Sequence, residues 1–287
     1  MLAGIEAGGT KFVLAVGPSP GRIIARHTIP TRTPETTLTE AAEWLAGQGG
    51  GLTALGIGSF GPVELDRRSP KWGFITNTPK PGWADCDIAG WLGQTLGVPV
   101  GFDTDVNAAA LAEHVAAGGG EGGLAYLTIG TGIGGGLVVD GKPVHGIAHP
   151  EMGHLYPRRH ADDRHFPGIC PVHGDCLEGL ASGPAIAARW GASLSELPAD
   201  HPAHAIIAET IAQACHTLFA SLAVGEVVLG GGVSNTPGLV ERIAARALEL
   251  DAGYFPGGAR HAIIRPRLGS DSGITGALML AEAALGA

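Results

Sequence analysis

The sequence predicts an α/β protein built from two similar halves. Apolar strand-like runs alternate with helical stretches along the chain, which is typical of a mixed or parallel sheet with helices on both faces. Two hairpin-like segments, Leu2–Val16 and Leu124–Val139, repeat the same order of apolar strand, turn with Gly and Thr, and returning strand. No low-complexity linker separates the halves. We therefore place the boundary in the glycine-rich segment Ala116–Gly123, which gives an N-terminal lobe of residues 1–117 and a C-terminal lobe of residues 118–287.

Five further elements are predicted in the first half. Short apolar and β-branched runs between turn residues indicate strands, and apolar residues that recur every three or four positions indicate helices. In chain order these elements are the strand Ile23–Thr31, the helix Thr36–Gln48, the strands Leu55–Ser59 and Val98–Phe102, and the Ala-rich helix Asp105–Ala117.

The same reasoning predicts five elements after the second hairpin. A long amphipathic helix comes first, and it is followed by a short buried strand that ends in three consecutive glycines. In chain order the elements are the helix Pro202–Ala223, the strand Val227–Leu229, the helix Leu239–Leu250, the strand Ala262–Arg265 and the closing helix Ile274–Leu285.

The composition favours an acidic, cytoplasmic protein. Lys and Arg number 18 against 27 Asp and Glu, so the net charge at pH 7 is −9 with His neutral. No basic run offers a footprint for nucleic acid or an anionic membrane, and no apolar run reaches the roughly eighteen residues of a membrane span. The 4 Cys are too few for a disulfide framework and suit a reducing compartment. We expect neither a nucleic-acid nor a membrane partner.

One stretch carries the residue types of a zinc site. Its four candidate ligands are His154, Cys170, His173 and Cys176. Four thiolate and imidazole ligands leave no position open for water, which describes a structural Zn²⁺. Glu151 and Glu178 lie close to these ligands along the chain, so a metal would fix two carboxylates able to hold sugar hydroxyls. The alternative is a region of buried Cys and surface His without a metal.

The two predicted hairpin turns have the composition of phosphate-binding loops. Glycine lets the backbone approach a ligand closely, and the N–H groups of such a turn can form a nest for phosphate oxygens. The residues concerned are Gly8, Gly9, Thr10 and Lys11 in EAGGTK, and Thr131 and Gly132 in TIGTGIGGG. The pattern is neither Walker nor Rossmann, because no GxxxxGK[ST] occurs and the glycines lead into a strand. Two ordinary β-turns are the alternative, but the repetition in both halves favours a nucleoside triphosphate.

A third glycine cluster follows the short buried strand of the second half. Bare backbone at this point would let the adenine and ribose of a nucleotide lie against the chain. A strand-to-helix turn without a ligand explains the pattern almost as well. The residues are Gly230, Gly231, Gly232, Val233, Ser234 and Asn235.

Asp105 is the candidate catalytic residue. It lies with Asp103 at the end of a predicted strand, where ligands bind in open α/β sheets. Phosphoryl transfer needs a carboxylate that orients a hydroxyl and accepts its proton. A helix cap is an equally good interpretation of Asp105 from the pattern alone, and the two roles are compatible.

Taken together, these motifs resemble those of the ROK-type sugar kinases, and within them most closely those of the bacterial zinc-containing fructokinases. The resemblance runs from Leu2 to nearly the end of the sequence. The motifs occur in the order EAGGTK, GSFGP, TPKPGW, DTDVNAAAL, TIGTGIGGG, HPEMGH, C-x2-H-x2-C-LEG and LGGGVS.

The resemblance implies an actin-like ATPase fold with two lobes, each with a mixed sheet and flanking helices, and with nucleotide and sugar in the cleft between the lobes. It implies transfer of the γ-phosphate of ATP to a hexose, most simply ATP and D-fructose giving ADP and fructose 6-phosphate. Mg²⁺ with the nucleotide and a homodimer are further implications. Glucose, mannose or an N-acetylhexosamine are alternative acceptors, and an actin-like ATPase without kinase activity is a more distant alternative.

Residue roles are carried over only where motifs match. Asp105 matches the family's base, and Asn107 in the same motif is expected to help hold the sugar. Glu151, His154 and Glu178 match sugar-binding residues, and His154 is also a zinc ligand. The two hairpin turns match the family's phosphate loops, and Gly230–Asn235 matches its adenosine end.

Two departures from the common family pattern point to the fructokinase branch. Glu6 stands where Asp is common, and His173 stands where the common zinc motif has Cys. Other classes fit less well. A repressor of the same family would need a DNA-reading helix-turn-helix before the first hairpin, and a zinc hydrolase would need an open coordination position.

Overall fold

The computed structural model describes residues 1–49, 51–120 and 122–286, which divide into two units. Unit 1 comprises Met1–Ala116, Pro143–Pro150 and the chain from Ser270 onward, and unit 2 comprises Ala117–Lys142 and Glu151–Gly269. In the structure, Pro143–Pro150 and the chain from Ser270 onward belong to unit 1. The division proposed from the sequence assigns everything after residue 117 to the second lobe. Residue 121, inside the proposed boundary segment, lies outside the described residues.

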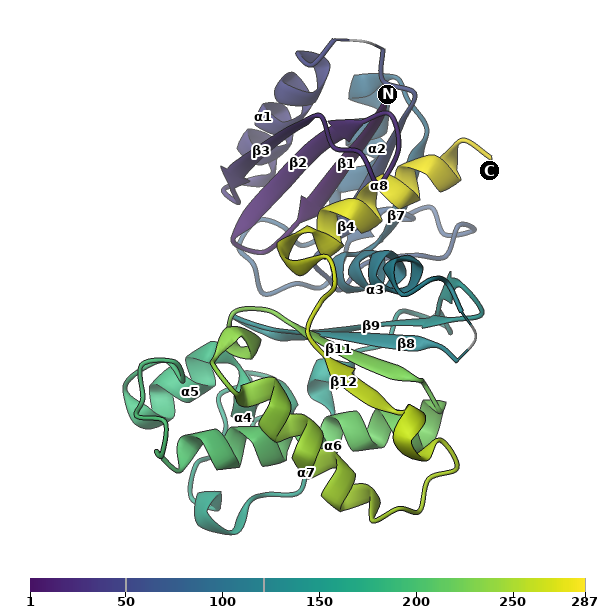
Figure 1. The fold of residues 1–287 in the computed structure, drawn as a ribbon. Coiled ribbons are helices and arrows are strands. Elements are labelled where there is room, and N and C mark those ends of the chain that lie inside the picture. The colour runs from purple at the N-terminus through teal and green to yellow at the C-terminus, as the bar shows by residue number, and fades with distance from the viewer. Residues whose placement is uncertain (50, 121, 287) are drawn as a thin grey trace. The chain divides into compact units, whose positions relative to one another are not determined.

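Unit 1 is organised around a five-stranded mixed sheet of order β3-β2-β1-β4-β7 (Figure 1). The first three strands form an antiparallel meander, and β4 and β7 run parallel to β1. The strands are β1 (Leu2–Ala7), β2 (Lys11–Gly17), β3 (Ala25–Pro30), β4 (Ala54–Ser59) and β7 (Val100–Thr104). A separate two-stranded ribbon joins β5 (Phe74–Ile75) to β6 (Cys86–Asp87).

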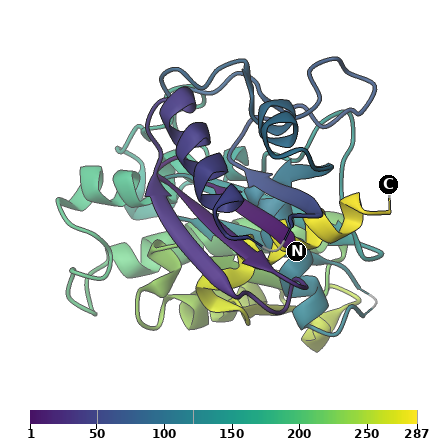
Figure 2. The ribbon, with the colours of Figure 1, turned by 90° about the horizontal axis from the view of Figure 1, so that it is seen from above.

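Both faces of this sheet are covered by helices, because its central strands are apolar on both sides. Ile5 packs with residues of α1 (Pro34–Ala46) and α2 (Ile88–Leu96), whereas Leu2 packs with residues of α8 (Ser272–Ala284). Figure 2 shows α1 beside the first strands of the sheet. The fourth helix of the unit, α3 (Asp105–Ala116), lies against α8 and starts where β7 ends.

Small residues allow α8 to lie close to the sheet and to α3. A Cβ atom at Gly56 of β4 would come 1.8 Å from the carbonyl oxygen of Ala277, and one at Gly276 would come 1.9 Å from that of Ala108. A buried hydrogen bond joins the same helices, with Ser272 Oγ donating to Glu113 Oε1 at 2.7 Å. The end of the chain is therefore built into unit 1 by close backbone packing.

Unit 2 repeats the strand order of unit 1 as β10-β9-β8-β11-β12. The hairpin β8–β9 is antiparallel, and β11 and β12 run parallel to β8. The strands are β8 (Leu124–Ile129), β9 (Ile133–Val139), β10 (Lys142–Pro143), β11 (Glu226–Gly230) and β12 (Ala262–Ile264).

Four helices and several short 3₁₀ turns complete unit 2. The helices are α4 (Leu177–Ala181), α5 (Gly183–Trp190), α6 (Ala203–Leu222) and α7 (Leu239–Asp251). The 3₁₀ turns are η1 (Met152–His154), η2 (Ala161–Asp163), η3 (Val233–Asn235), η4 (Gly258–Arg260) and, at the junction with unit 1, η5 (Gly269–Asp271).

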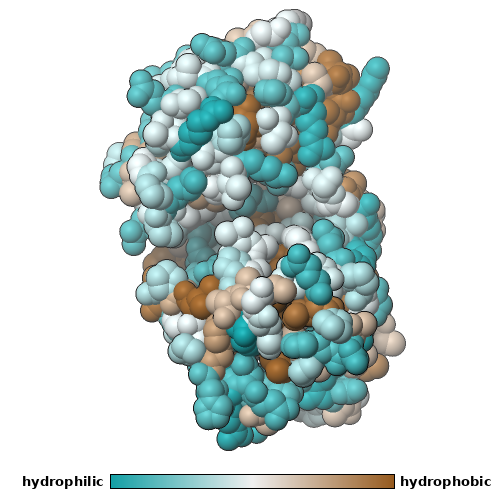
Figure 3. All heavy atoms as spheres, turned by 90° about the vertical axis from the view of Figure 1, so that its left-hand side faces the viewer, coloured by the Kyte–Doolittle hydropathy of each residue, from teal (hydrophilic) through white to brown (hydrophobic). Residues whose placement is uncertain are grey.

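Among the described helices, α6 alone is long and apolar enough to match a membrane span in length and composition. It is instead a core helix, because 56% of its most apolar stretch is buried and Ile207, Ile211 and Cys215 are fully buried. Hydrophilic side chains cover most of the face drawn in Figure 3, as expected from the acidic composition.

The elements predicted from the pattern are present, with ends that differ by a few residues. The sequence pattern missed α2, α4, α5 and the short strands β5, β6 and β10. The helix α2 contains Gly90 and Gly93, which weaken a helical pattern, and it is held by Asp87, whose carboxylate accepts from the N–H of Gly90 at 2.8 Å.

Candidate active site

Three polar side chains of unit 1 meet where β7 ends and α3 begins. Asp103 Oδ1 accepts from Asn107 Nδ2 at 2.8 Å, and Asp103 Oδ2 lies 2.9 Å from His145 Nε2. Asp103 and Asn107 are buried, whereas the side chain of His145 is 38% exposed. The hydrogen bond to Asp103 raises the pKa of His145, against the opposing effect of partial burial. Because Asn107 is fully buried, it can act on a ligand only through its neighbours.

Asp105 is the first residue of α3 and is half-buried. Its Oδ1 accepts from the N–H of Val106 at 2.9 Å. The bond expected of a helix cap is made by the preceding residue, since Thr104 Oγ1 accepts from the N–H of Asn107 at 3.1 Å. Capping therefore does not require the Asp105 carboxylate, and a side chain at this end of the sheet is well placed to meet a ligand.

Glu6 of β1 is a second carboxyl group near Asp105. Burial, and then the negative charge of Asp105, raise the pKa of Glu6 to about 7. The side chain reaches α8, where a Cβ atom at Gly273 would come 2.4 Å from Glu6 Cδ. The extra methylene of Glu relative to Asp is therefore accommodated by a glycine at the start of α8.

The first hairpin turn, between β1 and β2, is exposed at Gly9, Thr10 and Lys11. Gly8 N donates to the Lys11 carbonyl at 2.9 Å, which closes the turn. A Cβ atom at Gly9 would meet nothing within 4 Å, so this position faces open space. An exposed glycine turn of this kind has room for a phosphate group against its backbone.

The second hairpin turn, between β8 and β9, holds Gly130, Thr131 and Gly132. Its side facing Glu178 is closely packed, because Glu178 Oε2 accepts from the N–H of Ile133 at 2.9 Å. A Cβ atom at Gly132 would come 2.6 Å from the same oxygen. The structure therefore places Glu178 against the turn predicted to bind phosphate.

In the third glycine cluster, the packing of the surrounding chain explains why two of the three positions are glycine. A Cβ atom at Gly230 would come 2.1 Å from the Tyr126 hydroxyl, and Gly231 has φ +86° with its Cβ position 2.4 Å from the Ile129 carbonyl. Gly232 differs, since a Cβ atom there would meet nothing within 4 Å. The cluster continues into η3, where Ser234 Oγ donates to the Gly230 carbonyl at 2.8 Å. Gly232 is thus the member that leaves space for a ligand.

The four predicted zinc ligands come together in unit 2. The candidate ligand atoms of His154, Cys170, His173 and Cys176 all lie within 4.8 Å of one another. His154 Nδ1 lies 3.4 Å from Cys176 Sγ, and Cys170 Sγ lies 3.8 Å from His173 Nδ1. The turn from Cys170 to Gly174 is closed by backbone hydrogen bonds in both directions, of 3.2 and 2.9 Å.

These residues fit zinc in both chemistry and spacing. Bond lengths of about 2.3 Å to sulfur and 2.0 Å to nitrogen place tetrahedral ligand atoms about 3.3–3.8 Å apart. The separations of 3.4 and 3.8 Å fall in this range, and the 4.0 Å between Cys170 Sγ and His154 Nδ1 lies just above it. Two thiols and two imidazoles would fill a four-coordinate shell without water. Glu151, the second predicted acid of this stretch, is exposed at the start of η1, and its carbonyl accepts from the N–H of His154 at 3.0 Å.

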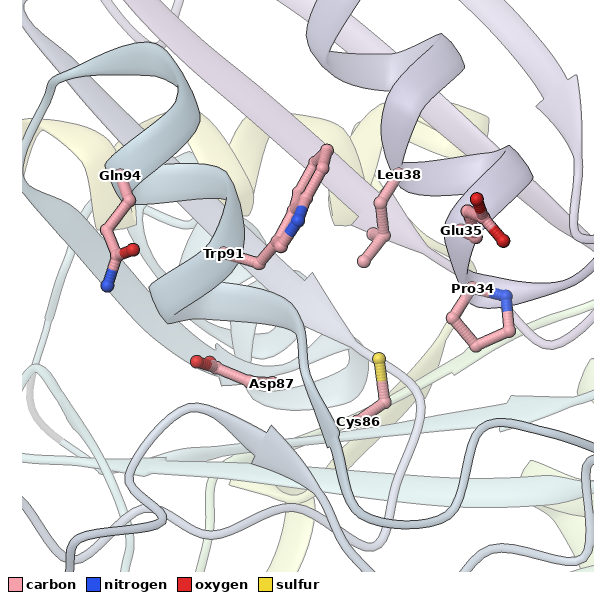
Figure 4. A pocket seen from close by; sticks show the side chains of 7 residues that line it. All are labelled: Pro34, Glu35, Leu38, Cys86, Asp87, Trp91 and Gln94. Atoms are coloured by element: carbon pink, nitrogen blue, oxygen red, sulfur yellow. The ribbon is translucent and has the colours of Figure 1, made fainter.

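A cavity of about 340 Å³ in unit 1 does not coincide with these groups. It lies between α1 and α2 in unit 1, and Figure 4 shows Leu38, Cys86 and Trp91 around it. None of the predicted site residues lines it. Burial raises the pKa of the Cys86 thiol to about 11, so this cysteine stays protonated and unreactive at neutral pH.

A profile of the ROK family matches residues 2–284 of this sequence. The chain belongs to the ROK family. Fructokinase from Zymomonas mobilis is 47% identical over 98% of this chain and 96% of its own. Fructokinase from Pediococcus pentosaceus is 41% identical over 99% of both chains.

The fold agrees with this membership. The crystal structure of the ROK hexokinase from Thermus thermophilus superposes with a TM-score of 0.76 at 29% identity, over 98% of both chains. The predicted family and the predicted actin-like architecture of two mixed sheets with flanking helices are therefore confirmed. Each unit of this ROK protein has a sheet of the same strand order.

Sequence reasoning found the DTDVN motif and the zinc ligands but missed His145 and the buried role of Asp103. His145 is 42 residues from Asp103 along the chain, and a lone His before HPEMGH has no local feature that marks its partner. The region holds several histidines, and only the fold shows that His145 bonds a carboxylate whereas His149 accepts from a backbone N–H.

Proposed function

We propose that this ROK protein is an ATP-dependent fructokinase. The observation that carries the proposal is the 47% identity to a fructokinase across almost the entire length of both chains. Identity to the ROK hexokinase of known structure is lower, at 29%, although the fold is the same. Fructose is therefore the favoured acceptor among the hexoses.

The proposed reaction uses Asp105 as general base. The C6 hydroxyl oxygen of fructose forms a bond to the γ-phosphorus of ATP while the bond from that phosphorus to the β,γ-bridging oxygen breaks. The hydroxyl proton passes to the Asp105 carboxylate, and the bridging oxygen leaves with ADP. Asp105 suits this role because it is half-buried at the carboxyl end of β7 and is not needed as the helix cap.

The sugar is proposed to be held by Glu151, His154 and Glu178 around the Cys and His cluster, and Asn107 of unit 1 is proposed to contribute through its neighbours. Asn107 acts in this scheme as a positioning residue, because its amide donates to Asp103 from a fully buried position. Glu178 has one oxygen bonded to Ile133 N–H, so its other oxygen is the one proposed to receive a sugar hydroxyl.

The nucleotide is proposed to bind through the two hairpin turns and the third glycine cluster. Gly8, Gly9, Thr10 and Lys11 would meet phosphate oxygens from unit 1, and Thr131 and Gly132 would do so from unit 2. Gly232 is the preferred contact for adenosine, since it faces open space. Mg²⁺ would accompany the phosphates, whose charge it neutralises.

The metal of the Cys and His cluster is proposed to be a structural Zn²⁺. It would be held by His154, Cys170, His173 and Cys176, and it would order the stretch that carries Glu151 and Glu178. A cytoplasmic location and a homodimer complete the proposal.

A coupled assay of ADP formation across a panel of hexoses tests the function. We expect kcat/KM for fructose to exceed that for glucose, mannose and N-acetylglucosamine by at least about tenfold, because a site that pairs each hydroxyl rejects sugars that leave a polar group unpaired. A higher value for another hexose would assign a different sugar kinase. ATP turnover that no hexose stimulates would instead favour an actin-like ATPase.

A further inference from the structure

The segment Pro143–Pro150, which we call the strap, is attached to unit 1 by two histidines. His145 Nε2 lies 2.9 Å from Asp103 Oδ2, and His149 Nε2 accepts from the N–H of Val63 at 3.1 Å. These partners belong to different parts of unit 1, since Asp103 is in β7 and Val63 follows β4. The strap is thus tied at two points.

Both attachment points lie at the end of the sheet where β4 and β7 have their carboxyl ends. β4 and β7 are adjacent parallel strands, with Ser59 paired to Thr104 at their carboxyl ends. His145 bonds beside the end of β7, and His149 bonds to Val63, the residue that follows the GSFGP motif at the end of β4. Ligands of open α/β sheets bind at this end, which is also where Asp105 begins α3.

The ring of His145 is oriented by a buried carboxylate. Asp103 is 2% exposed, and its carboxylate oxygen accepts in this bond, so His145 Nε2 is the donor. Asn107 Nδ2 lies 3.3 Å from the same nitrogen, but both atoms are then donors, and the amide is already bonded to Asp103. The Asn107 amide holds the Asp103 carboxylate, and that carboxylate fixes the imidazole.

The second ring nitrogen of His145 is left for another partner. Within the part of the chain that the structure describes, no hydrogen bond of Nδ1 is found, and the side chain is 38% exposed. A sugar hydroxyl both donates and accepts, so it can pair with Nδ1 in either protonation state of the ring.

We propose that His145 is a sugar-binding residue that contributes to the choice of acceptor hexose, with Asp103 as its positioning residue. This proposal rests on the proposed kinase function. The oriented Nδ1 would bond one hydroxyl of the hexose on the strap side of the site. A rigid donor or acceptor of this kind distinguishes sugars by the placement of that hydroxyl.

The substitution His145→Gln separates the two functions of the ring. The Gln side chain can donate from its amide to Asp103, as His145 Nε2 does, but it has no atom equivalent to the free Nδ1. We expect the Kd of fructose, measured by titration calorimetry, to rise about tenfold, as for loss of one hydrogen bond to an oriented polar group. The Kd of ATP and the melting temperature should be unchanged. His27→Gln, on exposed β3 of the same unit, is the matched control and should leave all three values unchanged.

Asp103→Asn gives a second measurement. It removes the charge that orients His145, so we expect the fructose Kd to rise in this variant. Adding His145→Gln should raise the Kd no further, because both substitutions act on the same contact with the sugar. An unchanged fructose Kd in His145→Gln overturns the proposal, as does an equal loss of ATP affinity and melting temperature, which would indicate a structural role. Failure of the proposed function shows differently, as absence of hexose-dependent ADP formation in the unaltered protein. If that protein also binds no hexose in the calorimeter, the role of His145 is overturned too.

Discussion

The two hairpin turns have the same place in two sheets of the same strand order, but different parts of the chain hold them. In unit 1 the turn is held from its own sheet. Thr31, directly after β3, donates through Oγ1 to the Gly8 carbonyl at 2.7 Å and through its N–H to the Thr10 carbonyl at 2.9 Å.

In unit 2 the turn is held from outside the sheet. Glu178 of α4 accepts from the N–H of Ile133 at 2.9 Å, and Gly183 at the start of α5 donates to the Gly130 carbonyl at 2.8 Å. Glu178 follows Cys176, one of the four residues of the Cys and His cluster, by two residues. The position of the second turn therefore depends on the stretch that a metal would order, whereas that of the first turn does not.

The largest expected effect concerns the chemistry carried by unit 1. We expect Asp105→Asn to lower kcat by a factor on the order of 10² or more, because the amide cannot accept the hydroxyl proton. Fructose and ATP binding and the melting temperature should stay close to those of the unaltered protein. Turnover within a few-fold of normal would show that another group is the base.

Metal removal is the next largest perturbation, and it should separate the two turns. We expect Cys170→Ser to hold substantially less than one zinc per chain by elemental analysis and to melt at a lower temperature. Hydrogen exchange should speed up at the β8–β9 turn and remain unchanged at the β1–β2 turn. Cys86→Ser, which alters a cysteine outside the cluster, is the control. An equal increase in hydrogen exchange at both turns would contradict the inference that only the second turn depends on the metal-binding stretch.

A pair of glycine substitutions tests the turns directly. A Cβ atom in Gly132→Ala would push Glu178 Oε2 from its place, since the two atoms would be 2.6 Å apart, whereas Gly9→Ala meets nothing within 4 Å. Loss of the Glu178 bond should weaken ATP binding by about tenfold, and Gly9→Ala should have at most a few-fold effect. Similar ATP Kd values for both variants would show that the hydrogen bond from Ile133 to Glu178 does not contribute to ATP binding.

The smallest effect expected is a pH-dependent change in stability at Glu6. The pKa of this group is raised from 4.5 to about 7 in the folded protein, so the folded state holds its proton more tightly and loses stability as the pH rises between these values. Glu6→Gln should remove this loss. We expect the melting temperature of Glu6→Gln minus that of the unaltered protein to increase by a few degrees between pH 4.5 and pH 7.5. A difference that does not vary with pH would mean that Glu6 titrates normally.

Much of the site could be predicted because its signals are local. The candidate zinc ligands are recognisable from residue type and spacing, since three of them follow a C-x2-H-x2-C pattern and His154 precedes them in a His-rich stretch. The hairpin turns were predicted because apolar strands flank short runs of Gly and Thr. Asp105 was found because a strand end followed by a helix start is visible in the pattern.

Other features could not be predicted because their partners are distant in the chain. Glu178 was assigned to sugar from its neighbour Cys176, but 45 residues separate it from Ile133, the group that its carboxylate meets. The same holds for α8, whose place in unit 1 depends on contacts with Gly56 and Ala108.

The sequence by itself determined most strands and helices, the clustered Cys and His residues and the family, because these depend on periodicity, residue type and order along the chain. Only the tertiary structure decided which glycines serve packing, that Asn107 is buried behind Asp103, and that His145 bonds that carboxylate. The physical reason is that hydrogen bonds and close contacts act over a few ångströms. Which distant residues come within that range is set by strand order and by the path of the connecting segments.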